Sequence, residues 1–331
     1  MPRSEDMSTS TPALPRERGR EIPKGLTDSG GTAATRTFRF GVVAAFARSG
    51  EEWAEKARRI ESMGYATLLM PDGLNHTLAP LPALTAAAVA TRTLRVGTYV
   101  IANDYRNPVL LAKEAATVDV LSSGRFELGI GVGRPAAAED NRMLGIPFDS
   151  GAVRVERLAE SITLIKTLWS GETATATGPH YAASTAQISP RPVQQPRPPI
   201  LVAAGKRRLL ELAAREADIV ALGIPPAEPE AGVAERIAWI REAAGSRFDQ
   251  IEINLNLMAV GEQVPRYVAS QMGLTAEGLA RAGAVAALTG TIDDMVEGLQ
   301  RRRETFGISY IAVGDELMEG LAPVVERLAG R

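Results

Sequence analysis

Two stretches, LRVGTYVIANDYRNP (94–108) and SGRFELGIGVGR (123–134), predict the fold of this chain. The first begins with apolar and β-branched residues, as in a strand buried on both faces. It ends in an Asn-Pro pair, which supplies a helix cap and a first-turn proline. Gly124 ends the helix that follows, ahead of a second apolar strand. Together they form a strand–helix–strand unit of about 35 residues, the size of one parallel crossover.

The same unit recurs along the chain, and eight strands each followed by a helix predict a (β/α)8 TIM barrel. A doubly wound sheet with a second domain would also alternate strands and helices, but such a chain usually shows a break in composition, and none is seen. The predicted strands are residues 38–43, 65–72, 95–101, 126–130, 198–205, 218–223, 251–260 and 308–314.

The barrel is expected to carry insertions in the loops after strands 4, 5 and 7, because three connections are too long for ordinary loops. These segments are 131–150, 171–199 and 261–289. Residues 1–37 are rich in Pro, Ser, Thr, Arg and Gly without apolar periodicity, which predicts a disordered N-terminal arm. The expected organisation is therefore this arm followed by one barrel domain at 38–331.

Composition excludes several classes of function. The 331 residues include 37 Lys and Arg against 39 Asp and Glu, so no basic surface for nucleic acid is expected. No apolar run reaches about 18 residues and no signal-peptide pattern is present, so we expect no membrane span and a cytoplasmic location. With no Cys and 2 His, thiol nucleophiles, thiolate metal sites and histidine-rich metal centres are excluded.

The GIGVG stretch at 129–133 resembles part of a dinucleotide fingerprint, but the third glycine would have to stand where Arg134 stands. Gly131 and Gly133 therefore indicate either a close approach of two backbones or room for a flat ring at the end of a strand. Arg134 itself is either a solvated surface group or a bidentate phosphate ligand.

The sequence AGKRR at 204–208 follows the predicted fifth strand and begins a helix. It lacks the glycine spacing of a Walker motif. Backbone amides at a helix N-terminus together with Lys206, Arg207 and Arg208 nevertheless favour a phosphate site. The alternative is an ordinary basic first turn, which the helix dipole disfavours.

Polar residues also follow the second and third strands. They are Asp72, Asn103, Asp104 and Arg106, each of which could be an ordinary turn residue. Since the carboxyl ends of parallel strands meet at one end of a barrel, together they indicate a pocket there. His76 is either a proton donor or an exposed loop histidine.

On these motifs the chain resembles the bacterial luciferase-like flavin and deazaflavin oxidoreductases. The resemblance covers residues 38–314 and includes MGYATLLMPD, AKEAATVDVLSSGRFELGIGVG and GTIDDMVEGLQRRRETFGISYIAV. It is greatest for the actinobacterial subgroup thought to use coenzyme F420, a deazaflavin. The resemblance implies a TIM barrel with the tricyclic ring at its C-terminal mouth.

The resemblance also implies roles for individual residues. Asp72 corresponds to an acidic residue near the ring. Thr98, Tyr99 and Val100 correspond to the segment that backs the ring, often through a non-proline cis peptide. The remaining implied cofactor-binding residues are Asn103, Gly131, Gly133, Arg134, Ala204, Gly205, Lys206 and Arg207.

Three positions depart from the family pattern. Gly73 and Asn107 stand where many relatives have histidine, and Arg134 stands where many have tryptophan. Arg134 instead corresponds to the arginine that binds the flavin phosphate in true luciferases. The acid–base assignment is therefore open, with Asp72 and His76 as the expected catalytic residues.

Three functions follow as hypotheses. The first is an F420-dependent oxidoreductase that reduces a C=C or C=N bond of an organic substrate by hydride transfer. The long insertions suggest a bulky secondary metabolite. The second is an FMN-dependent monooxygenase that uses O2, which Arg134 favours. The third is a non-catalytic barrel, given Gly73 and Asn107. The family usually forms homodimers or larger homo-oligomers, and the same is expected here.

Overall fold

The computed structural model describes residues 36–75 and 77–331. The compact unit considered below spans Thr35–Arg331. All but two residues of the predicted N-terminal arm lie outside the described residues, and so does His76.

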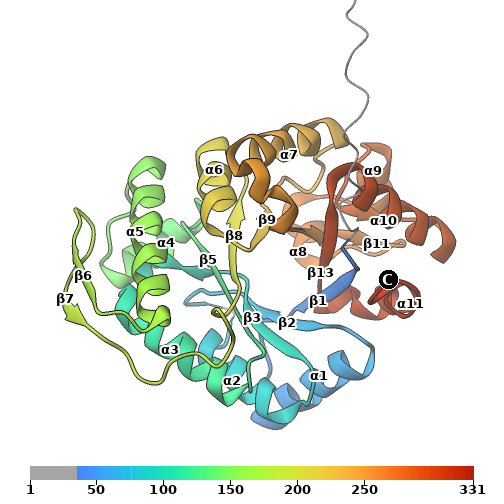
Figure 1. Cartoon of the computed structure of the whole chain (residues 1–331). Coiled ribbons are helices and arrows are strands. Elements are labelled where there is room, and N and C mark those ends of the chain that lie inside the picture. The colour runs from blue at the N-terminus through green and yellow to red at the C-terminus, as the bar shows by residue number, and fades with distance from the viewer. Residues whose placement is uncertain (1–35, 76) are drawn as a thin grey trace, which may run out of the picture. The chain divides into compact units, whose positions relative to one another are not determined.

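The described chain forms a closed barrel of eight parallel strands, which confirms the predicted fold (Figure 1). Neighbouring strands pair in sequence order, and the ring closes where β1 pairs with β13 and β3 pairs with β5. The barrel strands are β1 (Arg39–Val43), β2 (Thr67–Met70), β3 (Arg95–Thr98), β5 (Phe126–Gly131), β8 (Ile200–Ala204), β9 (Ile219–Leu222), β10 (Glu252–Leu257) and β13 (Ile308–Gly314).

A helix follows each barrel strand and covers the outside of the ring. Local signals set their starts: Asn107 accepts a hydrogen bond from the amide of Val109 at 2.9 Å, and Thr291 forms a capping box with Asp294. The helices are α1 (Gly50–Ser62), α2 (Pro80–Ala90), α3 (Pro108–Leu121), α5 (Gly151–Ser170), α6 (Arg207–Glu216), α7 (Glu230–Ala244), α10 (Ile292–Phe306) and α11 (Met318–Leu328). No helix in the described ranges has the length and apolar character needed to cross a bilayer.

The long segments form small elements of their own. After β5 comes α4 (Ala137–Leu144), and after β10 come β11 (Ala259–Val260), α8 (Arg266–Met272), α9 (Ala276–Arg281) and β12 (Ala287–Leu288). Short elements elsewhere are β4 (Ile101–Ala102) and the 3-10 turns η1 (Asn103–Tyr105), η2 (Gly245–Gln250) and η3 (Asp315–Leu317).

One insertion differs in place from the prediction. Segment 171–199 holds the hairpin of β6 (Ala174–Thr177) and β7 (Ala182–Ala186), which lies beside α5 (Figure 1). It therefore precedes the fifth barrel strand, β8. The loop after β8 has no insertion, because only Gly205 and Lys206 separate that strand from α6.

The core consists of two shells, since parallel strands in a barrel bury both faces. The outer shell lies between strands and helices and includes Phe40 and Trp53. The Trp53 indole donates a hydrogen bond to the carbonyl of Ala83 at 2.7 Å. The inner shell fills the barrel with Leu69, Leu201, Ile219, Ala221, Tyr310 and Ala312.

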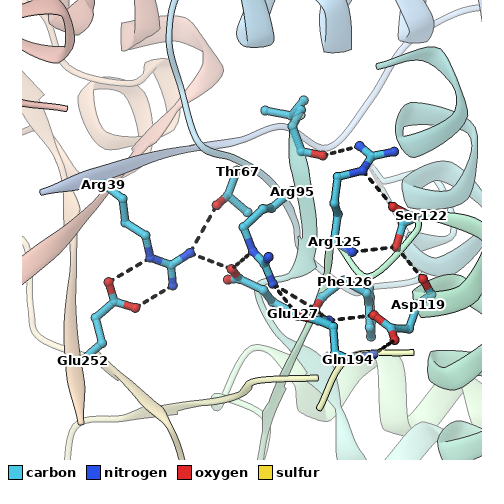
Figure 2. A network of polar contacts seen from close by, with 11 residues as sticks. Arg39, Thr67, Arg95, Asp119, Ser122, Arg125, Phe126, Glu127, Gln194 and Glu252 are labelled. Carbon is cyan, nitrogen blue, oxygen red and sulfur yellow. Dashed lines mark hydrogen bonds and ion pairs between the residues drawn. The ribbon is translucent and has the colours of Figure 1, made fainter. Parts of the chain in front are cut away.

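Charged side chains close the N-terminal end of the barrel (Figure 2). Arg39 donates to Glu127 at 2.6 Å and to both carboxylate oxygens of Glu252, and Arg95 donates to Glu127 at 2.6 Å. Burial alone would raise the pKa of Glu127, but Arg39 and Arg95 outweigh it and the pKa is lowered. This network therefore holds four barrel strands together through side chains.

Candidate active site

The chain bends sharply where β3 reaches the C-terminal mouth of the barrel. The peptide bond between Tyr99 and Val100 is cis, as the family resemblance implies. The Thr98 hydroxyl donates to the carbonyl of Gly129 at 2.6 Å and accepts from its amide at 2.8 Å. Thr98 is thus bonded to the neighbouring strand and is 1% exposed. We call residues 98–100 the shelf.

Glycines on β5 make the shelf possible. A Cβ atom on Gly129 would lie 1.9 Å from the Thr98 carbonyl oxygen, and one on Gly131 would lie 2.8 Å from Val100 Cγ2. The space beside Gly129 and Gly131 is therefore filled by the shelf itself, so Gly131 does not clear room for a ring directly. Gly133 has a positive φ of 75° and accepts a hydrogen bond from Arg154 at its carbonyl. Its role is to turn the chain.

The Tyr99 hydroxyl donates to the side-chain oxygen of Asn254 at 2.6 Å. This bond crosses the barrel, because β3 and β10 stand four strands apart in a ring of eight. Asn254 in turn donates to the carbonyl of Tyr310 at 3.1 Å. Burial raises the pKa of Tyr99, so its phenol stays neutral and remains a donor. The Tyr99–Asn254 hydrogen bond separates the packed interior from the mouth.

Beyond this hydrogen bond, the inward-facing positions carry small side chains. Ala203, Ala221 and Ala312 belong to the inner shell at this level. Asn256 stands two residues beyond Asn254 on the same face of β10, and its buried amide oxygen has no hydrogen-bond partner in the described chain. We did not predict Asn254 and Asn256 as site residues, although the alternating sequence INLNL indicates that both face the same side of the strand.

Asp72 lies at the mouth, but its carboxylate is already engaged. Arg106 donates to it at 2.5 Å and 3.4 Å, and the amide of Ala102 donates at 3.2 Å. Its side chain is only 5% exposed. Asp72 therefore acts as an acceptor that orients Arg106. Beside them, burial and the nearby Asp140 raise the pKa of Tyr105 to about 12.

The structure separates the other two predicted rim residues from Asp72 and Arg106. Asn103 is 1% exposed and donates to the Tyr181 hydroxyl of the hairpin segment at 3.1 Å. Asp104 accepts from Arg157 of α5 at 2.8 Å. The 3-10 turn after β4 directs Asp104 to α5 and Asn103 to the hairpin segment, while the buried Oδ1 of Asn103 has no hydrogen-bond partner among the described residues. A role for Asn103 in cofactor binding stays a prediction. Arg157 was not expected from the sequence.

Part of the predicted phosphate loop has the required geometry. Ala204 ends β8, and Gly205 passes so close to the next strand that a Cβ would lie 2.0 Å from the Gly223 carbonyl oxygen. Lys206 is the N-cap of α6, is exposed, and forms no ion pair with a described residue.

The two arginines that follow Lys206 are paired. Arg207 pairs with Glu211 and Glu242. Arg208 pairs with Glu156. Lys206 and the first amides of α6 thus remain open to an anion, whereas the charge of Arg207 is neutralised.

Arg134 is exposed directly after Gly133 and likewise has no ion-pair partner within residues 36–75 and 77–331. Its charge acts on Tyr267 of α8: burial raises the pKa of that phenol, and Arg134 opposes the rise. The loop after β5 therefore approaches the insertion after β10 at the rim. The second predicted catalytic residue, His76, lies outside the described residues.

Three features define the class of protein: the barrel, the cis peptide after β3 and the glycine-bearing strand β5. The model of the family described as luciferase-like monooxygenase matches residues 34–305. The chain belongs to this family, whose members found by comparison are oxidoreductases and monooxygenases.

Several curated proteins are similar in sequence. An F420-dependent glucose-6-phosphate dehydrogenase from Beutenbergia cavernae is 35% identical over 166 residues, 48% of each chain. One from Nakamurella multipartita is 31% identical over 226 residues, 65% of each chain. The oxygenase component of the flavin-dependent trigonelline monooxygenase from Acinetobacter baylyi is 36% identical over 133 residues, 40% of this chain and 36% of that protein. The chain thus spans roughly a third to two thirds of the length of these relatives.

Solved structures share the fold. The F420-dependent tetrahydromethanopterin reductase from Methanopyrus kandleri has a TM-score of 0.72 at 18% identity, covering 88% of this chain and all of that chain. A monooxygenase from Streptomyces bottropensis has a TM-score of 0.67 at 23% identity, covering 88% and 97%.

Proposed function

We propose that this protein is an F420-dependent oxidoreductase that reduces a C=C or C=N bond of an organic substrate. The observation that carries the proposal is the arrangement of the mouth, where a bent shelf and small side chains lie two strands away from an open Lys206. A flat ring with a phosphate-bearing tail has the matching shape and charge. The F420-dependent relatives support the deazaflavin as the ring.

The residues of the mouth fit such a cofactor. Tyr99 and Val100 would support one face of the ring, while Ala203 and Ala312 leave width for it. Lys206 and the first amides of α6 would hold the phosphate. When bound in its reduced form, the deazaflavin supplies a hydride. Below it, the Tyr99–Asn254 hydrogen bond and the packed inner shell exclude water from the floor of the site.

The proton that completes a reduction has to come from the rim. Asp72 is an acceptor held by Arg106, so its contribution is to fix the guanidinium at the edge of the mouth. His76, four residues after Asp72 in the sequence, remains the proposed donor.

A second candidate is an FMN-dependent monooxygenase that acts with O2. The similarity to the trigonelline monooxygenase component favours it, as does the open guanidinium of Arg134 at the rim. FMN carries its phosphate on a short ribityl chain. In this alternative Arg134, in place of Lys206, binds that phosphate.

Direct titration separates these functions. Purified protein is mixed with F420 and with FMN, each oxidised and reduced, and binding is followed by fluorescence or absorbance. Tight binding of F420 supports the proposal, and tight binding of FMN alone would support the monooxygenase. If the protein binds neither cofactor, the result would support the hypothesis of a non-catalytic barrel.

We also propose that the chain forms a homodimer through α2 and α3. Apolar side chains lie on the outer surface of these helices, with Val89 72%, Leu110 53% and Leu121 52% exposed. Light scattering after size exclusion is expected to give twice the chain mass. Leu110→Glu should shift the protein to monomer, and a wild-type monomer would refute the proposal.

A further inference from the structure

The rim of the mouth carries apolar side chains that are open to solvent. Six large ones are exposed in the loops that follow β1, β2, β5 and β10, all at the C-terminal end of the barrel. They are Phe46, Leu74, Met143, Leu144, Tyr267 and Met272. Exposed apolar side chains around a binding site are typical of contact with an apolar ligand. The molecule that enters the mouth is therefore expected to have a largely apolar body.

Tyr267 of α8 is the aromatic rim residue whose contacts place it near the shelf. Its hydroxyl donates to Met258 Sδ at 3.3 Å. Met258 directly follows β10, four residues beyond the Asn254 that bonds to Tyr99. Burial is the main cause of the raised pKa of Tyr99, and the nearby Tyr267 phenol adds to the rise. Because the Tyr267 side chain is still 40% exposed, a ligand in the mouth can contact its ring.

Arg134 approaches Tyr267 from another part of the rim. It follows β5, which stands three strands away from β10 in the barrel. Burial raises the pKa of Tyr267 and the charge of Arg134 opposes the rise, so the two side chains are neighbours. Arg134 is exposed and has no ion-pair partner among the residues that the structure describes. On the same loop, Arg142 is neutralised by Glu139.

An exposed aromatic ring beside an open guanidinium favours one kind of small molecule. A planar apolar body can pack against the ring of Tyr267, and a carboxylate can accept two hydrogen bonds from the planar fork of Arg134. A sugar phosphate is less suitable, because its hydroxyl groups would lie against apolar side chains without hydrogen-bond partners.

We propose that the substrate is an aromatic carboxylic acid, bound with its ring against Tyr267 and its carboxylate on Arg134. This inference rests on the proposed function, in which the shelf and Lys206 form the cofactor site and Arg134 is left without a role. The acid then lies on the α8 side of the mouth, across from the shelf.

Calorimetric titration of the full chain in saturating F420 tests the proposal. The probes are benzoate, trans-cinnamate and 2-naphthoate, each compared with its uncharged amide. The ring-free acid crotonate and glucose 6-phosphate complete the set. At least one aromatic acid should bind about ten-fold or more tightly than its own amide, crotonate and glucose 6-phosphate, because none of these can satisfy both Tyr267 and Arg134.

Three variants assign the binding to the two residues. Arg134→Gln should remove the difference between an acid and its amide. Tyr267→Ala should weaken aromatic acids about two- to ten-fold and leave crotonate unchanged, as expected for loss of an aromatic contact. Arg142→Gln, on the same loop but already paired with Glu139, is the matched control and should bind every probe as wild type does.

The Kd for F420, measured separately on the same proteins, distinguishes this inference from the proposed function. It should be unchanged in all three variants. Wild-type protein that does not bind F420 would overturn the proposed function and this inference with it. If F420 binds but no aromatic acid does, or acid and amide bind equally, only this inference is wrong. A raised Kd for F420 in Arg134→Gln would also overturn it, because Arg134 would then belong to the cofactor site.

Discussion

The two ends of the barrel use the same inward-facing positions in opposite ways. At the N-terminal end, Arg39, Arg95, Glu127 and Glu252 satisfy one another across four strands (Figure 2). At the C-terminal mouth, the inward positions carry alanines, and the amide oxygen of Asn256 has no partner in the described chain. One end pairs its charges with one another, although Glu127 Oε2 is buried without a hydrogen-bond partner in the described chain, and the other end carries small side chains and an open amide oxygen in place of such pairs.

This difference separates stability from function along each strand. β10 shows it within one element: Glu252 pairs with Arg39, Asn254 bonds to Tyr99, and Asn256 is open. Within five residues, the inward-facing positions of β10 thus change from structural closure at Glu252 to an open amide at Asn256. Substitutions of Glu252 should destabilise the fold, and substitutions near Asn256 should change ligand binding.

The largest effect is expected from Glu127→Gln. The change leaves Arg95 without a carboxylate and weakens the pairing of Arg39, in a site where the Glu127 side chain is 2% exposed. Removing one partner of a buried ion pair costs about 3–5 kcal/mol. Denaturant unfolding should show this loss in the free energy of unfolding.

The control for Glu127→Gln is Glu139→Gln. Glu139 also pairs with an arginine, Arg142, but both side chains are exposed on α4. No measurable change in stability is expected, because solvent screens such pairs. Equal losses in the two variants would contradict the view that the N-terminal network closes the barrel.

Gly131→Ala tests the shelf. The added Cβ would lie 2.8 Å from Val100 Cγ2. Val100 should therefore shift, costing about 1–3 kcal/mol of stability. The Kd for the cofactor should rise about ten-fold or more, since a ring site tolerates little misplacement. Gly50→Ala, where nothing lies within 4 Å of the new Cβ, should change neither measurement.

Most of the fold was predictable because local signals agree with the global pattern. The helix predicted to begin at the Asn-Pro pair is α3, in which Asn107 is the N-cap and Pro108 the first residue. Segment 171–199 was counted as following the fifth strand, although it ends where the predicted strand 198–205 begins; in the structure its hairpin precedes β8.

The site was less predictable, because sequence order does not show which way a side chain points after a strand ends. Asn103 and Asp104 follow β4 like rim residues, yet the 3-10 turn directs them to Tyr181 and Arg157. The partners that neutralise Arg207 lie 4 and 35 residues away. The pair with Glu211 is a local i,i+4 pair on α6, whereas the pair with Glu242 of α7 depends on a tertiary contact that no local motif contains.

Lys206→Ala should have a moderate effect confined to binding. Lys206 is open at the N-terminus of α6, so its loss should raise the Kd for a phosphate-bearing cofactor about ten-fold, or ~1.4 kcal/mol. Arg207→Ala is the matched control and should change the Kd little, since its charge is already paired. Arg134→Ala tests the FMN alternative. If the cofactor is FMN, this substitution and not Lys206→Ala should raise the Kd for the cofactor.

The smallest expected effect concerns pH and again belongs to the N-terminal end. Glu61 accepts hydrogen bonds from the amides of Arg92, Thr93 and Leu94 just before β3. Burial opposes its charge, but these bonds lower its pKa from 4.5 to about 2. A lowered folded-state pKa means that the stabilisation is complete above pH 4.5 and is lost as the pH falls toward 2.

Glu61→Gln should therefore be slightly less stable than wild type at neutral pH and should lose less stability between pH 5 and pH 3. Thermal unfolding over this range measures the slope. Lys206→Ala, at the opposite end of the barrel, should keep the wild-type slope, because it alters no carboxylate that the folded state holds ionised. If Glu61→Gln and wild type lose stability in parallel, the prediction for Glu61 is wrong, and the acid sensitivity resides in other carboxylates with lowered pKa values, among them Glu127 and Asp294. A changed slope in Lys206→Ala would show that the substitution acts on more than the anion site.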